Sequence, residues 1–205
     1  ITCTANNGVK TTFAVSVKMT DKAGNVSSKR ANFSIDGEDI ELQSISTATD
    51  SGTYKAGTVI PVLLTFNKAV KVEEEIVVIL NNDKPLPIAK SNDYKNTLTV
   101  NYKVENNEDC KSLNVKSISG KVVDERPKEL TLNSNILNKA TNIADTRTIN
   151  IDTEVPTVTG FSSTATAGSW YNAGKMIQIT MACSEIVNVA DGATLSLSSG
   201  GVATY

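Results

Sequence analysis

Acidic side chains are concentrated in two short segments of the chain, at residues 36–39 and 152–154. Ca²⁺ takes about six to eight oxygen ligands, and carboxylates from two abutting domains could supply several of them. The candidate calcium ligands are Asp36, Glu38, Asp39, Asp152 and Glu154. The alternative is that these carboxylates lie in solvated linkers and bind no metal. Neither segment contains an EF-hand or nonapeptide calcium loop.

Acidic runs that could supply the carboxylate pair of a glycosidase occur at Glu73-Glu74-Glu75 and at Asp124-Glu125. Glycosidases also need an aromatic-lined cleft, and only 5% of the residues are aromatic. A charged strand end or a solvated loop is the simpler place for both runs. The chain has no histidine, which removes the commonest general base and any Ser-His-Asp triad. The sequence therefore predicts that the protein is not an enzyme.

The three cysteines, Cys3, Cys110 and Cys183, lie far apart and include no Cys-x-x-Cys pair. They indicate neither a zinc cluster nor a redox motif, and their odd number argues against a disulfide framework. We expect Cys183 to be a small buried side chain and Cys110, which lies in a polar loop, to be exposed.

The charge balance names no partner, because 20 Lys and Arg residues face 22 Asp and Glu residues. This composition offers no basic footprint for nucleic acid. The longest apolar runs, such as 76–80, are far shorter than the roughly 20 residues of a membrane-spanning helix. We therefore predict no nucleic-acid partner and no membrane insertion in this segment.

The elements that must position these side chains recur along the chain. Ser46-Thr47-Ala48-Thr49 returns as Ser163-Thr164-Ala165-Thr166, an offset of 117 residues. The same offset relates residues 21–26 to residues 138–143, and Ile35-Asp36 returns as Ile151-Asp152 at an offset of 116. It also relates six further pairs: Tyr54 and Tyr171, Ala56 and Ala173, Gly57 and Gly174, Ile60 and Ile177, Val70 and Val187, and Val72 and Val189.

We therefore predict three repeats, of which only the middle one is complete. Residues 1–36 are the closing part of one repeat, residues 37–152 are a whole repeat, and residues 153–205 open a third. A period near 117 residues is much longer than the roughly 20 to 50 residues of solenoid repeats, so each unit should bury its own core. The predicted partners of each repeat are the neighbouring repeats of the same protein.

Apolar and polar residues alternate along several segments, which is the period of half-buried strands. The predicted inward sets are Phe13, Val15, Val17 and Met19; Ile60, Val62, Leu64 and Phe66; Leu98, Val100, Tyr102 and Val104; and Ile177, Ile179, Met181 and Cys183. No segment shows a helical period, and clusters of Asn, Asp, Ser and Gly mark turns between the runs. The fold class is therefore all-β, and a sandwich is favoured by analogy with other domains of this size.

Three segments carry a resemblance: the run from Phe13 to Asn25, residues 151–156, and residues 168–174 followed by an alternating strand and Ser184-Glu185-Ile186-Val187. They resemble, in that order, the closing strands, the inter-repeat linker and the opening half of bacterial immunoglobulin-like tandem repeats of large surface and adhesin-type proteins. The resemblance implies tandem immunoglobulin-like β-sandwich domains, an extracellular or cell-surface location, and interdomain calcium in some arrays. The middle copy has Lys68 where the third has Glu185, so a role of that acidic position is not shared by all copies.

A structural spacer, or stalk, that projects a distal adhesive or catalytic domain is the leading functional hypothesis. The alternative is a binding module whose loops contact a glycan or a host protein. Trp170-Tyr171 could stack on a sugar ring, although Tyr171 repeats Tyr54 and is expected to be structural. A third possibility is a fibre subunit, because closing strands at one end and opening strands at the other could complete one another between chains. Truncation of a longer protein explains the same ends more simply.

Overall fold

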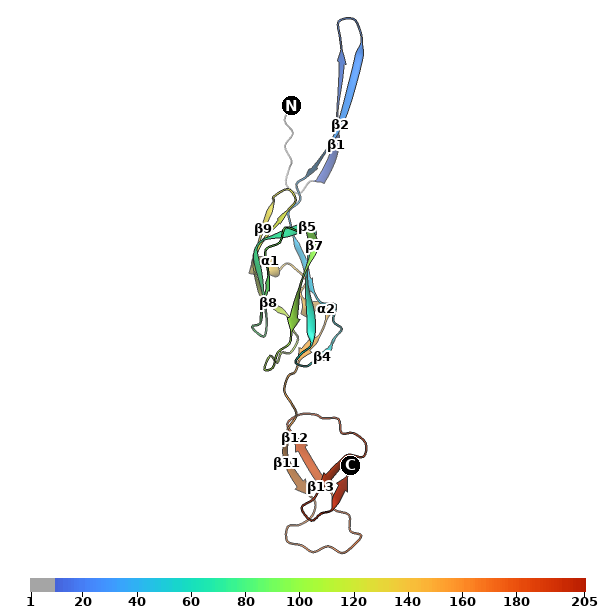
Figure 1. Cartoon of the computed structure of the whole chain (residues 1–205), viewed down its shortest axis with the longest axis vertical. Helices are drawn as coiled ribbons and strands as arrows, with labels where there is room; N and C mark the ends of the chain where they lie inside the picture. Colours follow the sequence, from blue (N-terminus) through green and yellow to red (C-terminus); the bar gives the residue numbers. More distant parts are fainter. Residues whose placement is uncertain (1–9) are drawn as a thin grey trace. The chain divides into compact units, whose positions relative to one another are not determined.

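The computed structural model describes residues 10–205, and β-strands dominate it (Figure 1). Strands account for 51% of the structure and helices for 4%, so the predicted all-β class is confirmed. The chain divides into two compact units, Ile1–Thr153 and Glu154–Tyr205. Cys3 lies outside the described residues.

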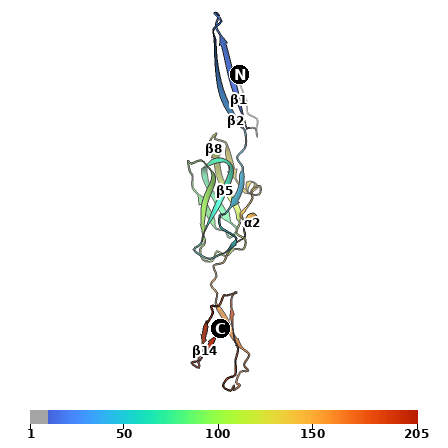
Figure 2. The ribbon, with the colours of Figure 1, turned by 90° about the vertical axis from the view of Figure 1, so that its right-hand side faces the viewer.

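The first described element is an antiparallel hairpin of β1 (Lys10–Thr20) and β2 (Val26–Asp36), whose strands run side by side in both views (Figures 1 and 2). Asp21 Oδ1 accepts hydrogen bonds from the backbone N–H groups of Ala23 and Asn25, and Gly24 has a φ of +90°. An Asx turn with glycine in the left-handed region explains why Asp-Lys-Ala-Gly-Asn reverses the chain.

The hairpin differs from the sequence prediction in its burial. Phe13 is half-buried by stacking on Phe33, with 5.6 Å between ring centroids. Val15, Val17 and Met19, which were predicted to face inward, are exposed to 39%, 50% and 61%. Alternation gives a strand one apolar face but does not supply the layer that covers it. No element among residues 10–205 buries the apolar face of this hairpin.

The central strands surround one hydrophobic core. The first half of the long strand β5 pairs with its neighbours β3 and β7, and its second half pairs with β6 and β8. Every fully buried residue of β5 has an even number, and the predicted set of Ile60, Val62, Leu64 and Phe66 is at most 2% exposed, which confirms that prediction. The elements are β3 (Leu42–Ser46), β4 (Gly52–Tyr54), β5 (Val59–Leu80), β6 (Pro85–Ile88), β7 (Lys95–Lys103), β8 (Val115–Asp124), β9 (Glu129–Leu132) and β10 (Ile149–Ile151).

Two short helices interrupt the strands of the first unit, and no helical period in the sequence indicated them. They are α1 (Ser134–Leu137) and α2 (Ile143–Thr146), which are too short to show a helical period. Their signal in the sequence is the asparagine before each one. The side chain of Asn133 accepts from the N–H groups of residues 135 and 136, and Asn142 forms a capping box with Asp145.

The second unit contains β11 (Val158–Ser163), β12 (Ile179–Cys183), β13 (Thr194–Ser196) and β14 (Val202–Thr204). Its strand pairing copies that of the central strands. Val158 pairs with Cys183 before a bulge, as Leu42 pairs with Phe66 before a bulge. The β13–β14 pairs, Thr194 with Thr204 through Ser196 with Val202, repeat the β5–β6 pairs, Val77 with Pro87 through Ile79 with Pro85, at an offset of 117.

Turns repeat in the same way. The N–H of Thr58 donates to Lys55 O and the N–H of Lys175 donates to Asn172 O, both at 3.2 Å, and the glycines at 57 and 174 have φ values of +88° and +85°. The offset is 116 from β3 to β11 and 117 from β5 to β12. The offset of 116 found at Ile151-Asp152 therefore extends to Ser162. The predicted inward residues of β12 are only partly covered, because Ile177 and Met181 are both 43% exposed.

Candidate functional site

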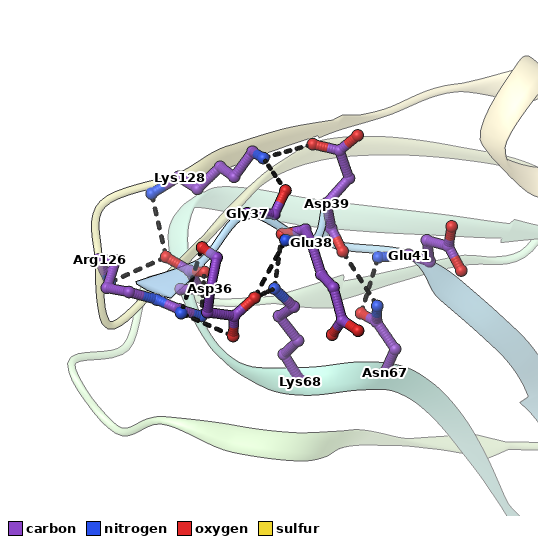
Figure 3. Close-up of polar contacts among 10 residues, drawn as sticks. Asp36, Gly37, Glu38, Asp39, Glu41, Asn67, Lys68, Arg126 and Lys128 are labelled. Atoms are coloured by element: carbon purple, nitrogen blue, oxygen red, sulfur yellow. Dashed lines mark hydrogen bonds and ion pairs between the residues drawn. The ribbon is translucent and has the colours of Figure 1, made fainter. Parts of the chain in front are cut away.

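The connection between β2 and β3 is surrounded by charged side chains of β5 and of the turn between β8 and β9 (Figure 3). The chain leaves β2 at Asp36 and enters β3 at Leu42, so residues 37–41 form a short linker. We use the name junction cluster for the charged residues that contact this linker or support those contacts: Asp36, Asp39, Lys68, Asp124, Arg126 and Lys128.

Asp36 is the centre of the junction cluster. Its Oδ1 lies 3.0 Å from Lys68 Nζ, and its Oδ2 lies 2.6 Å from Arg126 Nη1. The side chains of Asp36 and Lys68 are only 11% and 9% exposed, whereas Arg126 is 45% exposed. Salt screens a covered pair of charges much less than an exposed pair, so the contact with Lys68 is the more persistent one.

The linker backbone is bound by the same cations. The carbonyl oxygens of Asp36, Gly37 and Glu38 accept from Arg126 Nη1 at 3.4 Å, Lys128 Nζ at 3.2 Å and Lys68 Nζ at 2.5 Å. Three successive carbonyls are therefore held by three different cationic side chains, as Figure 3 shows in part. Charge-assisted hydrogen bonds of this kind are stronger than neutral ones.

Asn67 binds the remainder of the linker. Its Oδ1 accepts from the N–H of Glu41 at 2.9 Å, and its Nδ2 donates to the carbonyl of Asp39 at 3.0 Å. Lys128 Nζ also lies 2.5 Å from Asp39 Oδ1. Neighbouring residues 67 and 68 of β5 thus bind both ends of the linker, which restricts its backbone dihedrals.

Asp124 positions two of the cations. It is the last residue of β8 and its side chain is 3% exposed. Its Oδ1 accepts from the N–H groups of Arg126 and Lys128 at 2.9 and 3.0 Å, and its Oδ2 lies 3.2 Å from Arg126 Nη2. Burial by itself would raise the pKa of the Asp124 carboxyl, but these backbone donors and Arg126 lower it below the ordinary value. The turn after β8 is therefore prearranged to present Arg126 and Lys128 to the linker.

The pH dependence of stability follows from these carboxylates. The hydrogen bond from Lys68 holds the pKa of Asp36 well below its ordinary value of 3.8, and Lys128 lowers the pKa of Asp39 in the same direction. A lowered folded-state pKa contributes stability above the unfolded value, and the contribution is lost as pH falls through the folded one. With no histidine in the chain, we expect a melting temperature that is flat between about pH 5.5 and 8. It should fall only below about pH 4.5, first through Glu73 and Glu108, whose pKa values are also lowered, and then through Asp36 and Asp39, in thermal melts across that range. A fall between pH 8 and 5.5 would contradict this assignment.

Hydrogen bonds also fix the residues at the C-terminal end of the first unit. Asp109 Oδ1 accepts from the N–H of Thr153 at 2.6 Å and from its Oγ1 at 2.7 Å. The N–H of Asn107 donates to the same Thr153 hydroxyl at 3.0 Å, and the N–H of Asp152 donates to Tyr54 O at 3.0 Å. No local pattern of the sequence indicates this contact, because the two side chains are 44 residues apart in the chain.

The predicted calcium ligands are brought together only in part. Asp36, Glu38 and Asp39 share the first junction. Asp152 directly follows β10 in the first unit, whereas Glu154 is the first residue of the second unit. At the first junction the carboxylates of Asp36 and Asp39 already bind Lys68, Arg126 and Lys128, and a divalent cation beside three cationic groups would be repelled. Binding of Ca²⁺ at this junction would require the two carboxylates to give up these ion pairs, and it stays a prediction. Across residues 10–205, no three Asp, Glu or Cys side chains are grouped as metal ligands would be. Calcium binding by Asp152 and Glu154 stays a prediction.

The acidic runs considered for glycoside hydrolysis lie on strands and turns. Glu73 lies 3.0 Å from Lys90 Nζ, and Glu74 lies 2.9 Å from Lys121 Nζ, so both carboxylates form ion pairs on the surface of β5. Asp124 has the turn-forming role described above, and Glu125 beside it is exposed. Asp124 thus ends a strand as expected, whereas Glu73 and Glu74 lie within β5 and not at a strand end or in a loop.

The aromatic pair and the cysteines have different surroundings. Trp170 is 98% exposed, whereas the hydroxyl of Tyr171 accepts from Thr166 N–H at 2.8 Å, as the hydroxyl of Tyr54 donates to Asp50 O at 2.7 Å. Both tyrosines bind the loop before them, in agreement with the structural role expected. Cys110 is half-buried rather than exposed, because it packs against the hydrophobic core, and burial raises the pKa of its thiol. Cys183 is half-buried rather than fully buried.

No protein-family model, curated protein or solved structure matches this chain. Within the described part of the chain there is no helix long and apolar enough to cross a membrane.

Proposed function

We propose that the chain is a non-catalytic spacer of a secreted or cell-surface protein, built from tandem immunoglobulin-like β-sandwich repeats. Its task is to hold a distal adhesive or catalytic domain away from a surface. Antiparallel ladders supply resistance to extension within each repeat, and short bound linkers supply stiffness between repeats. The function is therefore mechanical and needs no catalytic group.

The repeat architecture is supported by the register of the strands. A bulge recurs at the same place in β3–β5 and β11–β12, and β13–β14 copies β5–β6 pair for pair. A sandwich is supported by the way in which the two halves of β5 join different partner strands around one core. Residues 1–36, 37–152 and 153–205 are the proposed repeats.

The observation that carries the spacer function is the binding of the linker by the junction cluster. A flexible connection would leave the carbonyls of residues 36–38 to water, whereas here each accepts from a cation of the central strands. Fixing a residue's backbone costs roughly 1 to 2 kcal/mol of conformational entropy, so such contacts make sense where a defined connection is required.

Replacing Lys68 tests this role. Lys68→Met keeps the apolar stem and removes the ammonium that joins Asp36 Oδ1 to the Glu38 carbonyl. We expect proteolytic cleavage within residues 36–41 to accelerate on the order of tenfold, because local opening limits cleavage. Small-angle scattering should show a broader distribution of distances than the parent chain.

The matched control is Lys116→Met, because Lys116 Nζ lies 2.6 Å from Asp83 Oδ1 but both side chains are more than half exposed and neither contacts the linker. This variant should leave cleavage of residues 36–41 unchanged. Equal cleavage rates in the two variants would contradict the proposal that the junction cluster stiffens the linker.

A binding module is a second candidate, and the exposure of one loop favours it. Trp170 and Met176, in the connection between β11 and β12, are 98% and 90% exposed. Trp170 is the single tryptophan of the chain, so its fluorescence reports on this loop alone. A glycan that stacks on it should shift the emission, and Trp170→Leu should weaken binding about two- to tenfold, since stacking contributes on the order of 0.5 to 1.5 kcal/mol. If no member of a glycan panel shifted the emission of Trp170, the binding-module candidate would be contradicted.

A further inference from the structure

The linker begins with an Asp-Gly pair, which the spacer function does not require. Asp36-Gly37 is one of two such pairs in the chain, and the other is Asp191-Gly192. In an Asp-Gly pair the backbone nitrogen of the glycine can attack the carboxyl carbon of the aspartate side chain. Glycine permits this approach because it has no Cβ. The two pairs have opposite surroundings.

The reaction starts from the neutral carboxyl, because an oxygen of the ionised form cannot leave as water. The nitrogen of Gly37 would bond to Cγ of Asp36 and lose its proton. One carboxyl oxygen would leave as water, with that proton and the proton of the carboxyl. A second water molecule opens the resulting five-membered succinimide. Attack at Cγ restores aspartate, whereas attack at the backbone carbonyl carbon gives isoaspartate, so no other reactant is needed.

The junction cluster opposes this reaction at Asp36 (Figure 3). Its Oδ1 accepts from Lys68 Nζ and from the N–H of Glu38, both at 3.0 Å. Its Oδ2 lies 2.6 Å from Arg126 Nη1. The two cations favour the charged carboxylate, whereas ring closure needs the neutral form. The bond to Glu38 directs Oδ1 past the nitrogen of Gly37, so the pair is protected by both charge and geometry.

The pair Asp191-Gly192 has none of this protection. Both residues are exposed, in a turn in which the N–H of Ala193 donates to Ala190 O at 3.1 Å. Within residues 10–205, no hydrogen bond or ion pair reaches the carboxylate of Asp191. This pair is therefore the internal reference for an Asp-Gly sequence without a junction cluster.

We propose that Asp36-Gly37 is a latent isomerisation site, which forms isoaspartate when the junction cluster opens and is protected while the cluster is closed. Isoaspartate lengthens the main chain by one methylene group and leaves the free carboxylate directly on Cα. The ion pairs with Lys68 and Arg126 are then lost, so the junction stays open and its opening is recorded covalently. This inference rests on the contacts of the junction cluster and not on the spacer function.

Turnover of the succinimide is measured by incubating the full chain near neutral pH in water enriched in the heavy oxygen isotope. Each opening of the ring by water incorporates one heavy oxygen, and peptide mapping by mass spectrometry assigns the label and the isoaspartate to each pair. In the folded parent chain, Asp191-Gly192 should take up label about tenfold faster than Asp36-Gly37. In denaturing urea the two pairs should label at similar rates, because the protection of Asp36 depends on the fold.

Two variants remove the protecting cations one at a time. Lys68→Met removes the cation at Oδ1 and should raise labelling of Asp36-Gly37 about fivefold, with Asp191-Gly192 unchanged. Arg126→Gln removes the cation at Oδ2 and should act in the same direction, which keeps the test decisive should Lys68→Met unfold the central strands. Hydrogen exchange of the central strands shows which variants are folded. The matched control, Lys116→Met, should leave both pairs as in the parent chain.

The outcomes separate this inference from the proposed function. Equal labelling of the two pairs in the folded parent chain would overturn it, as would unchanged labelling of Asp36-Gly37 in the folded variants. If Lys68→Met accelerated cleavage of residues 36–41 without accelerating labelling, the isomerisation site would be contradicted and the spacer function would stand. Faster labelling without faster cleavage would support the isomerisation site and contradict the role of the cluster in stiffening the linker.

Discussion

Gly120→Ala is expected to lower the free energy of unfolding of the central strands by about 3 kcal/mol or more. Gly120 lies in β8 opposite an irregularity of β5, where the pairing shifts between Glu74 and Val77. An added Cβ would lie 2.6 Å from Glu75 O and 2.7 Å from Ile76 Cα, and both are backbone atoms that cannot turn away. The residue also has a φ of +123°, which side chains rarely adopt.

Two other glycines separate the effect of the close contact from the effect of the positive φ. Gly57→Ala meets open space but keeps a φ of +88°, so it should cost about 1 kcal/mol from backbone strain. Gly52→Ala has no positive φ and contacts only the Tyr54 ring at 3.6 Å, so it should change stability by less than about 0.5 kcal/mol. Urea unfolding of the three variants should rank them in that order. If Gly120→Ala were no worse than Gly57→Ala, the close approach of β5 and β8 would be contradicted.

Asn142→Ala is expected to cost about 2 to 3 kcal/mol. Asn142 caps α2, accepting from the N–H of Ile143, and its own N–H donates to Asp145 Oδ2 at 2.7 Å. The same side chain spans to β8, where Oδ1 accepts from Val115 N–H at 3.2 Å and Nδ2 donates to Val115 O at 3.0 Å. Alanine would remove the cap and leave two backbone groups of a buried residue without their partner.

Asn142→Asp distinguishes the two roles. Aspartate retains the acceptor for Ile143 and for Val115 N–H but turns the donor to Val115 O into a second acceptor. It should therefore preserve α2 while loosening its contact with β8. Hydrogen exchange at Val115 and Ile143 resolves the two effects. Asn138→Ala is the control, because that side chain is exposed and makes none of these contacts. Equal losses for Asn138→Ala and Asn142→Ala would contradict the assignment.

Much of the central fold was predictable from alternation. The even-numbered set from Ile60 to Phe66 was assigned to the core and is buried, because a strand places successive side chains on opposite faces. Leu98, Tyr102 and Val104 follow the same rule, whereas Val100 is only half-buried. The short helices could not be found by period, since four residues complete hardly more than one turn.

The candidate site was predictable only as a concentration of charge. Asp36, Glu38 and Asp39 drew attention as carboxylates, and calcium was the partner considered for them. The carboxylates of Asp36 and Asp39 form ion pairs with the cations at positions 68, 126 and 128, which are 32 to 90 residues away in the chain. An ion pair formed across such a separation has no period, so no local pattern of the sequence identifies it.

The sequence by itself determined the all-β class, the offset of 116 to 117 residues at which its motifs recur, and which side of each strand is apolar. Only the tertiary structure decided which apolar faces are covered and which charges meet. Burial depends on a second layer that local alternation does not specify, and ion pairing depends on where the turn after Asp124 and the strand at Lys68 come together beside the linker.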